Sequence, residues 1–310
     1  MSALNEQQLP DERGRWTSRS IGSALQHRIF YLLIRLGGRR AAYFLLYAVV
    51  LYYTLCRPTL RRRSYFYLQR RFPGRSGAGR LIDSYRLNLM LGKVLVDRAV
   101  VGILGPAAME VRLHGREELL ALLAEGQGLI LLNAHAGCWQ VAMSALGFLP
   151  TPVNMLMQRE DGDLDRHYFE HAGLASPYRI IDPRGFLGGT LEMMAVLKKG
   201  EVLCVMGDRL LGSDRSAVSV DFLGGEVQFP FSALKLASTT GAPVGVLLSW
   251  KSGPNSYELA LAGTIRVPPG LGRRPEHFAP SARAFARILE DYCQRHPYQF
   301  FNFFDMWAKP

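Results

Sequence analysis

The stretch LLNAHAGCWQVAM, residues 131–143, sets the type of fold. The apolar run 129–133 ends just before His135, the chain turns at Gly137, and residues 138–147 then show helical periodicity. An apolar run of this length, followed by a glycine and an amphipathic segment, predicts a buried strand that leads into a helix. His135 then lies in the turn at the carboxyl end of the strand, either as a catalytic base or as an ordinary structural histidine.

The same alternation continues along the chain and predicts one α/β domain with a central, mainly parallel or mixed sheet flanked by helices. In such sheets the carboxyl ends of the strands gather the active-site residues. His135, Arg159, Asp182 and Asp208 each follow a predicted strand, so we expect them at one edge. The predicted helices are 81–104, 116–124, 138–147, 163–172, 190–199, 231–240 and 281–295, and the predicted strands are 129–133, 153–157, 178–182, 202–207, 217–222, 243–250 and 257–267.

The net charge of the chain lies entirely in its first quarter. Residues 1–75 hold 14 arginines, no lysine and 3 acids, whereas residues 76–310 hold 23 basic and 23 acidic groups. This asymmetry favours a basic attachment region ahead of a neutral globular domain. We therefore divide the chain into a polar tail (1–24), a basic and apolar membrane-associated helical region (25–75) and the α/β domain (76–310).

The attachment region contains AAYFLLYAVVLYYTLC, residues 41–56, without a charge. As a helix this run spans about 24 Å, which is short of the ~30 Å hydrocarbon core. A second apolar run, Ile29–Ile34, precedes it, so two half-length helices broken at Gly37–Gly38 would enter and leave one leaflet of an anionic membrane. A core helix with a solvated arginine run is the alternative. We set nucleic acid aside as a partner, because the arginine cluster directly abuts the apolar stretch.

The first 20 residues are polar and lack the apolar core of a signal peptide. The four cysteines, Cys56, Cys138, Cys204 and Cys293, have neither metal-site nor disulfide-framework spacing. We therefore expect a protein of the reducing cytoplasm, at the cytoplasmic face of the inner membrane.

The segment NAHAGCWQ resembles the N-x-H-x-G-N-W-E block of the lipid A late acyltransferases, a branch of the lysophospholipid acyltransferase superfamily. Residues 206–248 are similar to a segment of that family that contains an aspartate, a phenylalanine–glycine turn, a proline and a strand that begins with the pattern tgaPv. The ending HPYQFFNFFDMW (296–307) resembles its C-terminal motif, with Met306 where the family usually has arginine. Residues 28–53 resemble its membrane-associated start, so the resemblance covers most of residues 25–307.

This resemblance implies acyl transfer from an acyl carrier protein or coenzyme A thioester, without a metal or a resident cofactor. His135 would be the general base, Asp208 would match the family's strand-end aspartate, and Arg159 would hold a substrate phosphate. The amides near Gly137 and Cys138, ahead of a helix that begins at Cys138 or Trp139, would face the developing oxyanion. Phe229 and Pro230 would close the pocket for the acyl chain, in a groove lined by Trp139, Met143, Met206, Phe222 and Phe229.

Gln140 departs from the family pattern, which has Asp or Glu five residues after the histidine. A glutamine carbonyl fixes the tautomer of the ring, but it cannot offset the charge of the imidazolium, and loss of the acid in a comparable triad costs about 10⁴ in rate. Three alternatives stay open. Another carboxylate replaces the missing one, with Asp208 as the first choice and Asp182 as the second; or the acceptor is an easily ionised phenol; or the site is inactive.

Two other motifs compete for function. HYFEH (167–171) has the H-x-x-E-H spacing of a zinc peptidase helix, but its third ligand is unassigned and an acidic, capped surface helix is the interpretation that we prefer. DPRGFLGGT (182–190) places glycines ahead of a helix, where backbone amides could cradle a phosphate and Arg184 could meet an anionic substrate. A plain strand-to-helix loop is the alternative for this segment.

Together these features predict a membrane-associated acyltransferase that moves a fatty acyl group to a hydroxyl or amine of a lipid or phenolic acceptor. Its partners would be membrane lipid and an acyl carrier protein. The alternative function is a catalytically inactive lipid-binding or scaffold protein of the same fold.

Overall fold

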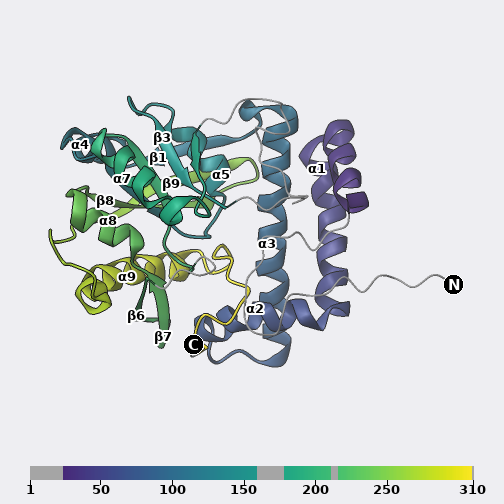
Figure 1. Ribbon diagram of the computed structural model, residues 1–310. Coiled ribbons are helices and arrows are strands. Elements are labelled where there is room, and N and C mark those ends of the chain that lie inside the picture. Colours follow the sequence, from purple (N-terminus) through teal and green to yellow (C-terminus); the bar gives the residue numbers. More distant parts are fainter. Residues whose placement is uncertain (1–23, 159–177, 211–215, 309–310) are drawn as a thin grey trace.

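The computed structural model describes residues 24–158, 178–210 and 216–308. Three N-terminal helices form a layer on one side of the molecule, and helix α3 lies between α1 and the α/β part (Figure 1). The bounds of these helices are α1 Ala24–Cys56, α2 Pro58–Arg71 and α3 Gly77–Leu104.

A seven-stranded sheet with the order β1-β9-β8-β2-β5-β3-β4 forms the centre of the α/β part. The five strands from β8 to β4 are parallel, while β9 is antiparallel to β8 and carries β1 in parallel at the edge. The predicted α/β class is therefore confirmed, with a sheet that is mainly parallel. The strands are β1 Glu110–His114, β2 Leu129–Asn133, β3 Val153–Leu156, β4 Arg179–Ile181, β5 Val202–Met206, β8 Val244–Lys251 and β9 Ser256–Ile265.

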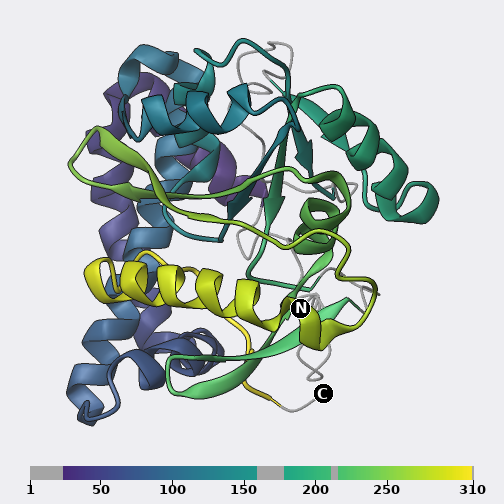
Figure 2. The same cartoon turned by 90° about the vertical axis from the view of Figure 1, so that its left-hand side faces the viewer.

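Strand β2 is buried at every position, as the apolar run LILLN requires of a strand covered on both faces. Helices pack against this sheet, and a separate hairpin of β6 and β7 lies beneath α9, the yellow helix in Figure 2. The hairpin strands are β6 Ala217–Phe222 and β7 Gly225–Pro230, and the helices are α4 Arg116–Ala124, α5 Trp139–Ala142, α7 Thr190–Lys198, α8 Ser232–Thr240 and α9 Ala279–Arg295.

Two strands, β1 and β7, are not among the predicted elements, whereas α2 lies inside the predicted helical region 25–75. Strand β1 (EVRLH) has no fully buried position, so its sequence lacks the apolar run that marks the inner strands. Helix α3 begins at Gly77, four residues before the predicted start at residue 81, because Ser76 caps it by accepting a hydrogen bond from the amide of Gly79. The predicted helix 163–172 lies outside the described residues.

The predicted break in the first helical region is present, because Gly38 has non-helical dihedral angles (φ 61°, ψ −164°) inside α1. Within residues 24–158, 178–210 and 216–308, no single helix has the length and apolarity to cross a bilayer. Helices α1 and α2, bent by 91°, meet that test only as a pair, by length and composition. Large apolar side chains on α1 are nevertheless exposed, and they are Leu25, Ile29, Leu32, Leu36, Phe44, Tyr47, Leu51, Tyr52 and Leu55.

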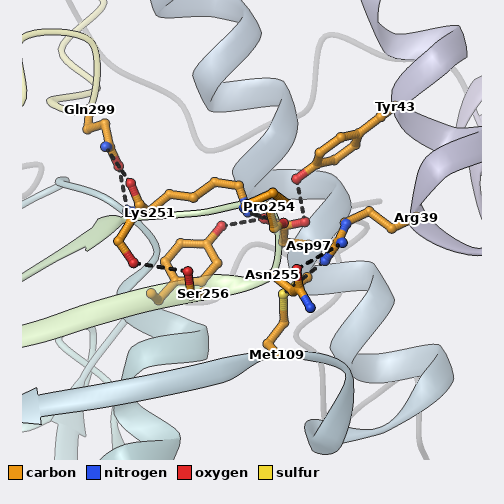
Figure 3. A network of polar contacts seen from close by, with 11 residues as sticks. Arg39, Tyr43, Asp97, Met109, Lys251, Pro254, Asn255, Ser256 and Gln299 are labelled. Carbon is orange, nitrogen blue, oxygen red and sulfur yellow. Dashed lines mark hydrogen bonds and ion pairs between the residues drawn. The ribbon is translucent and has the colours of Figure 1, made fainter.

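A buried carboxylate joins this helical layer to the sheet. Asp97 on α3 accepts a hydrogen bond of 2.6 Å from the hydroxyl of Tyr43 on α1, and its other oxygen accepts bonds of 2.6 Å from Lys251 Nζ and the Tyr257 hydroxyl (Figure 3). The side chains of Asp97 and Lys251 are 0% and 6% exposed. Burial lowers the pKa of Lys251, and the nearby Asp97 carboxylate opposes that shift. The carboxylate therefore compensates a buried cation while it fixes α1 and α3 against β8 and β9.

We predict that Asp97→Asn lowers the free energy of unfolding by about 3 kcal/mol, because it leaves the Lys251 ammonium buried without a counter-charge. Denaturant titration followed by circular dichroism measures the loss. Glu125→Gln is the control, since the Glu125–Arg266 pair is largely exposed and its loss should cost less than about 1 kcal/mol. Equal stability losses in the two variants would contradict the role given to Asp97.

Candidate active site

His135 follows β2 and faces Asp208, which follows β5. The Nδ1 atom of His135 lies 2.9 Å from Asp208 Oδ1 and 3.1 Å from Oδ2. The neighbouring strands β2 and β5 are parallel, and the amide of Gly207 donates to the carbonyl of Asn133 at their carboxyl ends. The sheet thus brings together the two residues that the sequence predicted at this edge.

The histidine ring is partly open, whereas its partner is not. The His135 side chain is 26% exposed and that of Asp208 is 0% exposed. When Nδ1–H donates to the carboxylate, the lone pair of the neutral ring resides on Nε2. This is the tautomer that a general base needs, with the acid holding the ring in place.

Arg209 places a buried positive charge beside the Asp208 carboxylate. Its Nε atom lies 3.5 Å from Asp208 Oδ2, and its side chain is 6% exposed. Burial and the Arg209 guanidinium lower the pKa of His135, and Asp208 opposes this shift. Burial by itself raises the pKa of Asp208, but His135 and Arg209 hold that pKa below its ordinary value. The resting pair is thus a neutral imidazole beside an ionised carboxylate.

The loop that carries His135 makes a close approach to the end of β8. Gly137 has a φ of 58°, and a Cβ atom there would lie 2.0 Å from the carbonyl oxygen of Ser249. The Gly137 amide donates to the carbonyl of Gln299 at 2.8 Å. In this conformation that amide is therefore engaged within the protein and does not face an oxyanion, contrary to our expectation.

Gln140 does not contact the histidine through any hydrogen bond in the described structure. It is buried on α5, and its Oε1 atom has no hydrogen-bond partner within residues 24–158, 178–210 and 216–308. The position taken by the family's acid is thus occupied by a buried amide, while the carboxylate reaches the ring from β5. Cys138, just before α5, is also buried, and burial raises the pKa of its thiol to about 11, so it remains a neutral thiol. Trp139 is partly buried.

Asp182, our second choice for the compensating acid, pairs with Arg184 instead. The two side chains lie 2.9 Å apart and are 44% and 53% exposed. Asp182 follows β4, and β3 lies between β4 and the strand that carries Asp208. Arg184 is therefore near the same sheet edge but already holds a carboxylate. Arg159 and HYFEH (167–171) lie outside the described residues.

The expected acyl-chain wall is filled with packed aromatic rings. Phe229 is 1% exposed and packs against Phe222 and Phe285, and Phe222 in turn stacks on Trp307. Pro230 ends β7 and pairs with Ala217 across the hairpin. The hairpin folds under α9, so Phe222 and Phe229 contribute to the core and do not line an open groove.

Two groups of residues at the site escaped the sequence analysis. Arg209 directly follows Asp208, and its place at a strand end is a signal that could have identified it. The main chain of residues 299–301 contacts the His135 loop, but nothing local in that segment indicates the contact.

The chain is similar in sequence to known acyltransferases. Two relatives, both named phosphatidylinositol mannoside acyltransferase, come from Mycobacterium tuberculosis strains ATCC 25618 / H37Rv and CDC 1551 / Oshkosh. Each is 29% identical over 144 residues, which is 45% of this chain and 44% of the relative, so the match spans less than half of either protein. The sequence profile described as bacterial lipid A biosynthesis acyltransferase matches residues 32–309. A histidine–aspartate pair at the sheet edge thus occurs in a chain that belongs to the bacterial lipid A biosynthesis acyltransferase family.

Proposed function

We propose that this protein transfers a fatty acyl group from an acyl carrier protein or coenzyme A thioester to a hydroxyl of a membrane lipid. The observation that carries the proposal is the contact between His135 Nδ1 and the Asp208 carboxylate in a member of an acyltransferase family. The named relatives act in lipid acylation, and the pair supplies the base that such a transfer requires.

In the proposed reaction, Nε2 of His135 takes the proton of the acceptor hydroxyl while the oxygen attacks the thioester carbonyl. The C–S bond then breaks, and the departing thiolate receives the proton from the imidazolium. General base catalysis of this kind contributes roughly 10²–10⁴ in rate. The Asp208 carboxylate offsets the positive charge of the imidazolium, so the acceptor need not be an acidic phenol.

The exposed apolar face of α1 supports attachment to a membrane. Phe44 is 83% and Leu36 is 78% exposed. Apolar side chains of this size are less favourable in contact with water than in contact with lipid. The charge of +11 carried by residues 1–75 would draw this face to anionic headgroups. We place the enzyme at the cytoplasmic face of the inner membrane, where the same charge would attract an acidic acyl carrier protein.

We predict that the acid limb of the kcat/KM profile has its midpoint below pH 6.5, because burial and Arg209 lower the pKa of His135 and the base is active when neutral. The rate of acyl transfer by the His135→Ala variant should fall to background. Asp208→Asn should lower kcat/KM on the plateau of the pH profile by a factor of about 10²–10⁴. It should also move the acid limb to still lower pH, since it removes the charge that raises the pKa of His135. Initial rates with acyl carrier protein thioester and membrane extract provide these profiles.

The rival function, a lipid-binding protein without activity, makes the opposite prediction for the same assay. Wild type and His135→Ala would then give equal background rates at every pH. Binding of lipid by both proteins without acyl transfer would rule out the proposed reaction.

Gln140→Glu tests whether the family's usual acid position matters here. We predict that activity does not rise, because Asp208 already occupies Nδ1 and a carboxylate at this buried position lacks a described partner. The variant should also be less stable by about 1–3 kcal/mol, the cost of a buried polar group without a partner. Rates and thermal melts of the variant measure both effects. Higher activity than wild type would show that the dyad is incomplete without an acid at residue 140.

Membrane attachment is tested by replacing two exposed residues of α1. Each apolar side chain contributes about 1.5 kcal/mol when buried, so Phe44→Ser with Leu51→Ser should weaken binding to anionic vesicles roughly 100-fold. Leu120→Ser on α4, which is 36% exposed, is the control and should bind as wild type does. Vesicle sedimentation measures the partition coefficient. Unchanged sedimentation of the double variant would exclude the α1 face as the attachment surface.

A further inference from the structure

The main chain of residues 299–301 runs alongside the loop that carries His135. The Phe301 amide donates to the His135 carbonyl at 2.8 Å, and the Gly137 amide donates to the Gln299 carbonyl at 2.8 Å. Ala136 and Phe300 thus form an isolated antiparallel bridge between segments more than 160 residues apart in the sequence. Both ends of the His135 loop are held by the C-terminal segment.

This segment also touches the acid of the dyad through Arg209. The Arg209 guanidinium donates to the Phe301 carbonyl and faces Asp208 Oδ2. These contacts form a closed ring. The side chains of His135, Asp208 and Arg209 contact one another in that order, and Arg209 binds the Phe301 carbonyl. The Phe301 amide then donates to the His135 carbonyl. The distance between base and acid therefore depends on where Phe301 lies.

The Gln299 side chain anchors residues 299–301 to the end of β8. Its Oε1 accepts from the Lys251 amide at 2.7 Å and its Nε2 donates to the Lys251 carbonyl at 3.1 Å. Lys251 is held by Asp97, so Gln299 connects the His135 loop to the network of Figure 3. Gln299 is 7% exposed, and both of its hydrogen bonds go to the main chain of Lys251, the last residue of β8.

We propose that Gln299 is a positioning residue of the His135–Asp208 pair, and that the bridge formed by residues 299–301 sets the approach of the imidazole to its carboxylate. The catalytic part of this inference rests on the proposed function. The geometric part concerns the pair itself and can be measured without turnover.

Gln299→Met keeps the size of the side chain and removes both bonds to Lys251. A misplacement of about 1 Å costs up to 10²-fold in rate, so we expect kcat to fall about 10- to 100-fold with KM within about twofold of wild type. The second readout is the nuclear magnetic resonance signal of the His135 Nδ1 proton in ¹⁵N-histidine-labelled protein, assigned by its loss in His135→Ala. In Gln299→Met this signal should weaken or shift, and the Gly137 amide should exchange faster with solvent.

Asn88→Leu is the matched control. Asn88 is likewise buried on α3, and its side-chain amide donates to Ser64 on α2 and to Ser84 on α3, without a hydrogen bond to residues 299–301. It should lower the melting temperature and leave the His135 signal and kcat unchanged. If Gln299→Met does not fold, Gln299→Glu retains the bond from the Lys251 amide but places its other oxygen against the Lys251 carbonyl, and it should change the same signals.

The two proposals fail in different ways. Wild type without acyl transfer in any assay, combined with a His135 signal that depends on Gln299, overturns the proposed function and keeps the positioning role. An unchanged His135 signal and unchanged kcat in the folded Gln299 variant overturn the positioning role. A loss of kcat that only follows the loss of stability, equal in Gln299→Met and Asn88→Leu, overturns it as well.

Discussion

The site depends on the close approach of one loop to two other segments. At Gly137 the backbone comes so near to the Ser249 carbonyl that a Cβ atom would lie 2.0 Å from it. This approach, together with a positive φ that side chains rarely adopt, reserves the position for glycine. The backbone of the loop therefore lies directly against the end of β8. In this position residues 299–301 pair with the loop, and the His135 side chain faces Asp208.

The position of the acid shows how a carboxylate can reach the histidine from a distant part of the sequence. In the family pattern the carboxylate lies five residues after the histidine, whereas here that residue is Gln140 and the carboxylate in contact with the ring follows β5. Adjacent parallel strands end at one edge of the sheet, so residues 133 and 206 are register partners although 73 residues separate them in the sequence. A chain with Gln140 therefore still presents a carboxylate to Nδ1.

The sequence was most informative where local patterns determine the structure. The buried strand β2 and the break at Gly38 follow from an apolar run and from glycine. The choice of Asp208 over Asp182 rests on the resemblance to the family's strand-end aspartate. The edge strand β1 was missed because charged residues alternate through it. The burial of Phe229 and the bridge at Phe300 were missed because both depend on how the C-terminal segment returns to the sheet, and no local pattern specifies a contact across more than 160 residues.

The Asp97 network explains how a separate helical layer can be held in a defined position. Apolar packing between α1 and α3 tolerates small shifts, because hydrophobic contact has no direction. A carboxylate that must satisfy Tyr43, Lys251 and Tyr257 together has only one arrangement in which no buried polar group is left without a partner. The ion pair and its hydrogen bonds offset the cost of burying Asp97 and Lys251, and the contacts continue through Gln299 to the main chain of the His135 loop. The exposed apolar side chains of α1 and the imidazole at the end of β2 are thus fixed relative to each other by directional bonds, which apolar packing alone would not achieve.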